Sequence, residues 1–299
     1  MQDKRLTEQP NPRSSRIDLL SSSEIVDLIN SEDRLVPEAV WKERKAIARA
    51  MDLAVEAFRN GGRLIYVGAG TSGRLGVLDA AEMPPTFGTD PGMVQGVIAG
   101  GPAALVEAQE GAEDSPEEGG WALDALGVND KDFVFGVASS GTTPFVHGAL
   151  ERARSVRAAT GILLCTPPAD ELTRTHDVVI APLVGPEVIT GSTRMKAGTA
   201  TKMVLNTITT GAMVRMGKVY GNLMVDLQVT CAKLKDRGER ILMGTLGVER
   251  AAAERFLEEA GGSVKVAIVM GRLEVGPQEA VRLLDKAGGQ VAKVLEGGP

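Results

Sequence analysis

Apolar residues recur at helical spacing over residues 22–60. The first run begins after Ser23, a residue type that often caps helix N-termini. Pro37 opens a second run, which ends at the chain-breaking triplet Asn60-Gly61-Gly62. We therefore expect two helices here, preceded by a polar, proline-containing arm over residues 1–15.

The hydrophobic period changes after these helices. Short, continuous apolar runs follow, with helical stretches between most of them. These runs are residues 63–67, 93–99, 133–138, 160–165 and 178–181. Continuous apolar strands that alternate with helices indicate a parallel sheet covered on both faces. We predict a doubly wound α/β domain over residues 54–217, with the N-terminal arm and helices over residues 1–53 preceding it.

No strand pattern continues beyond Gly217. Residues 220–240 have the pattern of one long helix, and shorter helical segments separated by glycines follow it. Those segments are residues 248–260, 263–270 and 277–286. We expect a small C-terminal helical bundle over residues 218–299.

Composition and charge exclude several classes of function. The net charge is −6, so the chain lacks the basic surplus of a nucleic-acid-binding protein. No apolar run reaches the roughly 18 residues of a membrane span, and the start lacks the apolar stretch of a signal peptide. Cys165 and Cys231 are the only cysteines and lie far apart, so we expect a cytoplasmic location. With two histidines, a multi-histidine metal site is nearly excluded.

The strongest chemical signal directly follows the first predicted strand. Residues 68–74 read Gly-Ala-Gly-Thr-Ser-Gly-Arg and open a helix that we expect over residues 75–82. Glycines free backbone N–H groups to point at an anion, and the helix N-terminus adds positive potential. The candidate phosphate-binding residues of this loop are Gly70, Thr71, Ser72, Gly73 and Arg74.

Other interpretations of this loop are weaker. It matches the dinucleotide fingerprint G-x-G-x-x-G, but the acidic residue required about 20 positions later is missing at Ala99-Gly100-Gly101. Arg74-Leu75 replace the Lys-Ser/Thr pair of an ATP-binding P-loop. A strand-to-helix turn without a ligand remains the alternative to an anion-binding loop.

A second loop has the same design. Ser139, Ser140 and Thr142 follow the third predicted strand and precede a helix. Hydroxyl groups at the carboxyl end of a strand suit a phosphate monoester, although an ordinary helix cap would have the same composition. Two such loops after two parallel strands predict a site for a phosphorylated small molecule.

A third segment, residues 190–202, enters a helix with hydroxyl groups and two cations in its first turns. Cations at that end oppose the helix dipole, and a bound anion would offset the cost. We therefore count Ser192, Arg194 and Lys196 as candidate substrate-binding residues. The alternative is that Arg194 and Lys196 simply pair with surface carboxylates.

Two groups of carboxylates accompany these loops. Glu82 lies at the end of the helix that the first loop opens, where Met83-Pro84-Pro85 are expected to stop it. A second acidic cluster spans residues 107–118 and includes Glu113. By pattern alone, that cluster is typical of a solvated helix face. Spacing does not pair Glu82 with any member of it.

Taken together, these motifs resemble the N-acetylmuramic acid 6-phosphate etherase family. The matching segments run in order along nearly the whole chain. They are residues 7–11, 68–74, 79–85, 110–114, 190–202 and 221–226. The family has the sugar isomerase (SIS) fold and is also similar to the glucokinase regulatory protein, a sugar-phosphate sensor without catalysis. One position departs from the family: Thr142 stands where its second loop usually has arginine.

The resemblance implies cleavage of the D-lactyl ether at C3 of N-acetylmuramic acid 6-phosphate, without a metal or organic cofactor. It maps the catalytic acid onto Glu82 and the base onto Glu113, and it suggests a homodimer. The chemistry is consistent, because the C1 aldehyde of the open-chain sugar acidifies the C2 proton that a carboxylate base would remove. An aldose–ketose isomerase and a non-catalytic sugar-phosphate sensor remain as alternatives.

Overall fold

The computed structural model describes residues 6–227 and 232–297. The chain divides into two compact units. Unit 1 comprises residues up to Glu82 and Pro91–Thr209, and unit 2 comprises Met83–Asp90 and the residues from Thr210 onward. The predicted three-part division at residues 53 and 217 stays a prediction.

A five-stranded parallel sheet forms the centre of unit 1, which confirms the predicted α/β fold. The strands are β1 (Leu64–Gly68), β2 (Val94–Ile98), β3 (Phe133–Val137), β4 (Ala159–Leu163) and β5 (Val178–Ile180). Their order is β2-β1-β3-β4-β5, so the winding reverses between β1 and β3. Open α/β sheets bind ligands at the carboxyl ends of the strands beside such a reversal.

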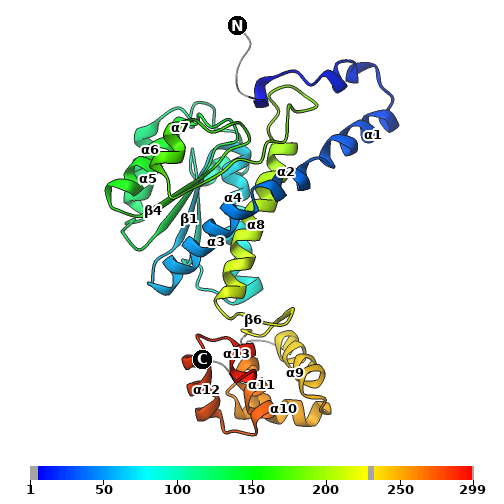
Figure 1. Cartoon of the computed structure of the whole chain (residues 1–299), viewed down its shortest axis with the longest axis vertical. Helices are drawn as coiled ribbons and strands as arrows, with labels where there is room; N and C mark the ends of the chain where they lie inside the picture. The colour runs from blue at the N-terminus through cyan, green and yellow to red at the C-terminus, as the bar shows by residue number, and fades with distance from the viewer. Residues whose placement is uncertain (1–5, 228–231, 298–299) are drawn as a thin grey trace. The chain divides into compact units, whose positions relative to one another are not determined.

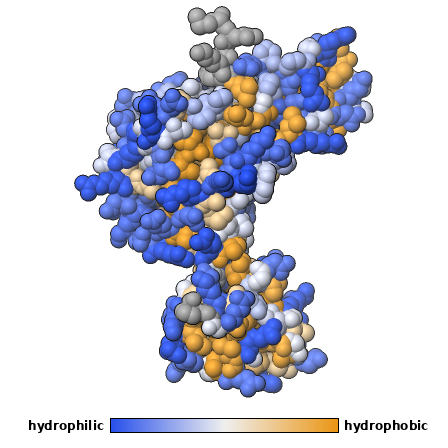
Figure 2. Space-filling view, viewed as in Figure 1, coloured by the Kyte–Doolittle hydropathy of each residue, from blue (hydrophilic) through white to orange (hydrophobic). Residues whose placement is uncertain are grey.

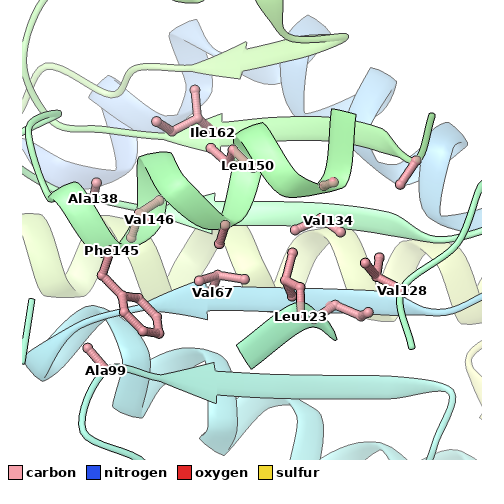
Figure 3. Packing of buried hydrophobic residues seen from close by; sticks show 14 of the residues in the cluster. Val67, Ala99, Leu123, Val128, Val134, Ala138, Phe145, Val146, Leu150 and Ile162 are labelled. Carbon is pink, nitrogen blue, oxygen red and sulfur yellow. The ribbon is translucent and has the colours of Figure 1, made fainter. Parts of the chain in front are cut away.

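Helices cover both faces of this sheet (Figure 1). One face carries α5 (Pro116–Ala125), α6 (Pro144–Ser155) and α7 (Asp170–Thr175), and the other carries α3 (Arg44–Arg59), α4 (Gly70–Phe87) and α8 (Lys196–Arg215). Under α6, Val146 and Leu150 pack on Val67, Val134 and Ile162 of the strands (Figure 3). Burial of both faces explains why the strands are apolar without alternation.

The N-terminal helices differ from the prediction at their ends. Helix α1 (Ser22–Asp33) is capped by Ser21 rather than Ser23, because Ser21 and Glu24 exchange hydrogen bonds in a capping box. The second predicted helix is divided at Glu43 into α2 (Val36–Lys42) and α3. The arm before α1 forms the short 3-10 helices η1 (Leu6–Glu8), η2 (Pro12–Ser14) and η3 (Ile17–Leu19).

Unit 2 contains the predicted helical bundle. Its helices are α9 (Ala232–Leu246), α10 (Arg250–Glu259), α11 (Val264–Leu273), α12 (Pro277–Lys286) and α13 (Val291–Leu295). The long helix predicted from residue 220 is wrong at its start, where β6 (Val219–Tyr220) and β7 (Leu223–Met224) pair as a hairpin. Gly221 takes a φ of +56° in the hairpin turn, a conformation that favours glycine. Residues 228–231 of that prediction lie outside the described residues. Within the described ranges, no helix has the length and apolar character to cross a membrane.

Candidate active site

The two hydroxyl-rich loops meet in one pocket of about 510 Å³, which we call the hydroxyl pocket. They follow β1 and β3, the two strands at which the sheet order reverses. Thr71 and Ser72 line the pocket from the first loop, and Ser139, Ser140 and Thr142 line it from the second. The Oγ atoms of Ser72 and Ser139 are 3.5 Å apart, so the loops are in direct contact. The sequence prediction that these loops form one site is consistent with this geometry.

The first loop turns sharply from β1 into α4. Gly70 has a φ of +51°, a left-handed conformation that other residues rarely adopt. Gly73 packs so closely that a Cβ atom there would lie 2.6 Å from the Ile98 side chain and 2.8 Å from the Gly68 carbonyl oxygen. The N-terminus of the 18-residue helix α4 is thereby held at the pocket, where its dipole favours an anion. Gly73 acts in packing and is not itself among the lining residues.

A histidine that the sequence analysis did not single out orders the second loop. His147, in the first turn of α6, has Nε2 2.8 Å from the carbonyl oxygen of Gly141. Within the loop, Thr142 donates its N–H to Ser140 Oγ at 3.3 Å. The position of His147 one turn into a helix that follows the loop is the only sequence signal that could have indicated this role.

Glu113 and Asp114 also line the hydroxyl pocket. They belong to a loop before α5, so the predicted helix face over residues 107–118 is wrong up to Ser115. The carbonyl oxygen of Glu113 accepts the N–H of Phe145 at 3.0 Å, which ties the acidic loop to the start of α6. Glu113 itself is solvent-exposed within the pocket.

Close packing between α5 and α6 fixes this arrangement. A Cβ atom at Gly119 would lie 2.0 Å from the Phe145 carbonyl oxygen, and one at Gly148 would lie 1.9 Å from that of Pro116. Only glycine permits the two helix backbones to approach this far. The acidic loop and the second hydroxyl loop are therefore attached to one tightly packed helix pair.

The comparisons with known proteins identify the family. Residues 46–154 match the family described as the glucokinase regulatory protein N-terminal SIS domain. An N-acetylmuramic acid 6-phosphate etherase of Salinibacter ruber is 57% identical over 263 residues, which cover 88% of this chain and 85% of the relative. One of Rhodopirellula baltica is 54% identical, covering 88% and 87%. The chain belongs to the N-acetylmuramic acid 6-phosphate etherase family. A phosphoheptose isomerase structure from Francisella tularensis has a TM-score of 0.48 at 17% identity, covering 63% of this chain and 98% of the other.

In this etherase family member, Glu82 lies away from the hydroxyl pocket. It is exposed on α4, twelve residues after Gly70, which corresponds to about 18 Å of helix at 1.5 Å per residue. Within one chain, the structure therefore does not bring Glu82 and Glu113 together. The helix also continues past Pro84 and Pro85 to Phe87, so the expected stop at Met83 is wrong. The two prolines leave the carbonyl groups one turn earlier without helical N–H donors, but the chain stays helical.

Asp79, one turn before Glu82, is buried and holds α4 to its neighbours. Its carboxylate accepts hydrogen bonds from the hydroxyl groups of Tyr66, at 3.0 Å, and Thr209, at 3.2 Å, and from the amide of Asn206. Burial raises the pKa of Asp79, and these hydrogen bonds only partly offset the effect. This cluster joins β1, α4 and α8 on the face of the sheet opposite α6.

The third predicted segment contributes backbone and a hydroxyl group rather than its cations. Gly191 and Thr193 line the hydroxyl pocket, whereas Ser192 and the exposed Arg194 do not. Lys196 is 1% exposed, and its Nζ lies 2.6 Å from the carboxylate of Glu32. Lys196 therefore pairs with a carboxylate of the protein, as in the alternative interpretation, but this carboxylate is buried and not on the surface.

Glu32 is the centre of a cluster that anchors the N-terminal arm. Its carboxylate accepts hydrogen bonds from Asn11 at 2.9 Å and Arg13 at 2.7 Å as well as from Lys196. Burial alone would raise the pKa of Glu32, but these partners outweigh burial and hold the pKa below its ordinary value. The anchored arm places Glu8 in the lining of the hydroxyl pocket, beside Gly191.

Arg74, the last predicted residue of the first loop, lines a different pocket. That pocket has a volume of about 280 Å³ and shares Ala69, Gly70 and Glu113 with the hydroxyl pocket. Among the described residues, no group of three or more His, Cys, Asp or Glu side chains is arranged to hold a metal ion.

Proposed function

We propose that this protein cleaves the D-lactyl ether of N-acetylmuramic acid 6-phosphate, giving N-acetylglucosamine 6-phosphate and D-lactate. One observation carries the proposal: the two hydroxyl-rich loops and Glu113 line one pocket, at the point where the strand order of the sheet reverses. Membership of the etherase family supports the same reaction. The cytoplasmic location expected from the sequence is part of this proposal.

The phosphate binds through neutral donors in this proposal. Ser72, Ser139, Ser140 and Thr142 supply hydroxyl groups, and α4 and α6 both begin at the pocket. None of the described residues that line the pocket is lysine or arginine. Each hydrogen bond to the charged phosphate is worth about 1.5–3 kcal/mol, so several of them hold the sugar in register without a cation.

The reaction needs one base and one acid. Glu113 removes the C2 proton of the open-chain sugar, and the C1 aldehyde accepts the resulting electron pair. The C3–oxygen bond then breaks, and the lactate oxygen takes a proton from Glu82. Water adds to C3 of the unsaturated aldehyde, C2 regains its proton, and the net reaction consumes one water molecule. The phosphate is remote from C2 and C3, so its binding energy serves to orient the sugar.

A homodimer completes the site in this proposal, with Glu82 reaching the hydroxyl pocket of a second copy. The separation of Glu82 from Glu113 within one chain supports this arrangement. The N-terminal helical segment also presents hydrophobic surface (Figure 2). Exposed apolar side chains of that segment are Leu19, Val26, Leu35 and Trp41. Such a patch is typical of a protein–protein contact.

Release of D-lactate from the muramic sugar phosphate tests the reaction. In heavy water, Glu113→Gln should abolish both lactate release and C2 exchange, whereas Glu82→Gln should block release and keep some exchange into substrate. Exchange at the wild-type rate in the Glu113 variant would show that the base lies elsewhere. Conversion of an aldose phosphate that carries a C2 hydroxyl group into its ketose, with no lactate released from the muramic sugar, would instead indicate an isomerase.

Mixed dimers test the shared site. When the Glu82→Gln and Glu113→Gln chains are co-expressed, a dimer that contains one of each has one intact site. Random pairing then restores about a quarter of wild-type activity, because half of the dimers are mixed and each has one of two sites intact. Mixtures as inactive as either variant alone would mean that the two glutamates do not come from different chains.

A further inference from the structure

The pocket that contains Arg74 adjoins the hydroxyl pocket directly. The two share Ala69, Gly70 and the carboxylate-bearing Glu113, so a ligand beside Glu113 can extend into both. The adjoining pocket measures about 280 Å³, against about 510 Å³ for the hydroxyl pocket. It therefore suits a substituent of a few atoms on a sugar that occupies the larger pocket.

The lining of the adjoining pocket has two chemical characters. Methyl groups of Ala99, Ala104, Ala108 and Ala112 form small apolar walls. Arg74 is its one cation among the described lining residues, and the hydroxyl pocket has none. A small group that carries both a methyl group and an anion matches this combination. The lactyl ether substituent is such a group, because it has one methyl and one carboxylate.

Arg74 is held in place but not neutralised. Its Nε donates to the carbonyl oxygen of Leu105 at 3.1 Å, which fixes the plane of the guanidinium. It forms no ion pair with any carboxylate of residues 6–227 and 232–297, although Glu110 and Glu113 line the same pocket. The side chain is half-buried, and its two terminal nitrogens remain able to bind a carboxylate in a bidentate manner.

We propose that Arg74 recognises the lactyl carboxylate, and that the pocket around it selects substrates with an acidic ether substituent. The inference rests on the proposed function and deepens it. The sugar and its phosphate occupy the hydroxyl pocket, the lactyl group occupies the adjoining pocket, and the C2 and C3 atoms lie beside Glu113, which borders both. Arg74 is then a specificity residue for the leaving group rather than a phosphate ligand.

The test compares the natural substrate with its lactyl amide, in which a neutral carboxamide replaces the carboxylate. The wild-type enzyme should cleave the acid with a kcat/KM about 10- to 100-fold above that of the amide, the range expected for loss of one charge-assisted pair. Arg74→Gln should lose about that factor on the acid and discriminate little between the two compounds. Arg282→Gln, an exposed arginine of unit 2, serves as the control and should behave like wild type. Equal losses on acid and amide in the Arg74 variant would overturn the proposal.

A binding measurement separates this proposal from the proposed function. N-acetylglucosamine 6-phosphate lacks the lactyl group, so its affinity, measured by calorimetry, should be the same for wild type and Arg74→Gln. A large loss of that affinity would make Arg74 a phosphate ligand and overturn the inference. If wild-type enzyme releases no D-lactate from the acid, the proposed function itself fails, whatever Arg74 does.

Discussion

Replacing Lys196 with methionine tests whether this residue is structural. Lys196 and Glu32 have side chains that are 2% and 3% exposed, with their charged atoms 2.6 Å apart. Removing one partner of a buried ion pair typically costs about 3–5 kcal/mol, because the other charge stays buried without its partner. Asn11 and Arg13 still bind Glu32 in the variant, so we expect the lower end, about 3 kcal/mol.

Tryptophan fluorescence during urea unfolding is the assay. Both tryptophans of the chain, Trp41 and Trp121, belong to unit 1, so the signal follows that unit alone. With a slope of about 2–3 kcal/mol per molar urea, a loss of 3 kcal/mol lowers the midpoint by about 1 M. Lys45→Met, on an exposed position of α3, is the matched control and should change stability by less than about 0.5 kcal/mol.

Two further measurements test the structural role of Lys196. The double variant Glu32→Gln/Lys196→Met removes both charges and should recover most of the loss. Because the pKa of Glu32 is lowered in the folded protein, its stabilisation is present above its ordinary value of 4.5 and is lost as the pH falls through the folded value. The deficit of Lys196→Met should therefore shrink in acid. A wild-type midpoint for Lys196→Met, or a double variant no more stable than the single one, contradicts the structural role.

Gly148→Ala should destabilise unit 1 by about 1–3 kcal/mol, as seen in its urea midpoint, because the new methyl group meets the Pro116 carbonyl. Burial raises the pKa of Asp79, so its charge costs stability at neutral pH and that cost disappears as the pH falls. Asp79→Asn should therefore be more stable than wild type at pH 7, and this advantage should shrink as the pH falls towards about 4. Ser72→Ala should lower kcat/KM for the phosphorylated sugar by a factor that corresponds to about 1–3 kcal/mol of lost transition-state stabilisation. Any turnover of an unphosphorylated analogue should change little.

Local pattern was sufficient for the sheet and for the two hydroxyl loops. Each strand is a continuous apolar run, and a parallel sheet brings the ends of its strands to one edge. The strand order is not readable from the local pattern, and the structure adds that β1 pairs with β3, which makes the two loops neighbours. The β6–β7 hairpin was not predicted, because a strand of two residues is too short to show an alternation of apolar and polar side chains. The helix through Pro84 and Pro85 contradicts a local rule.

Contacts between distant segments carry no local signal. Glu32 and Lys196 are 164 positions apart, and nothing in either segment indicates that they form a buried pair. The place of Lys196 at a helix start suggests an anion-binding role. The structure fills that helix start with an anion of the protein itself, because the Glu187 carboxylate accepts the backbone N–H groups of Lys196 and Ala197. Family resemblance pairs Glu82 with Glu113, whereas the fold separates the two residues within one chain.

The hydroxyl pocket has no lysine or arginine among its described lining residues, while Glu8, Glu113 and Asp114 line it, and this determines how a sugar phosphate reaches it. Hydroxyl and N–H donors act over hydrogen-bond distances, whereas a cation would attract an anion from about 8–10 Å at physiological salt. The chain as a whole carries a net charge of −6, so its long-range field does not draw an anionic sugar in. Capture therefore depends on random encounter followed by docking, and added salt, which screens the repulsion, should speed association rather than slow it.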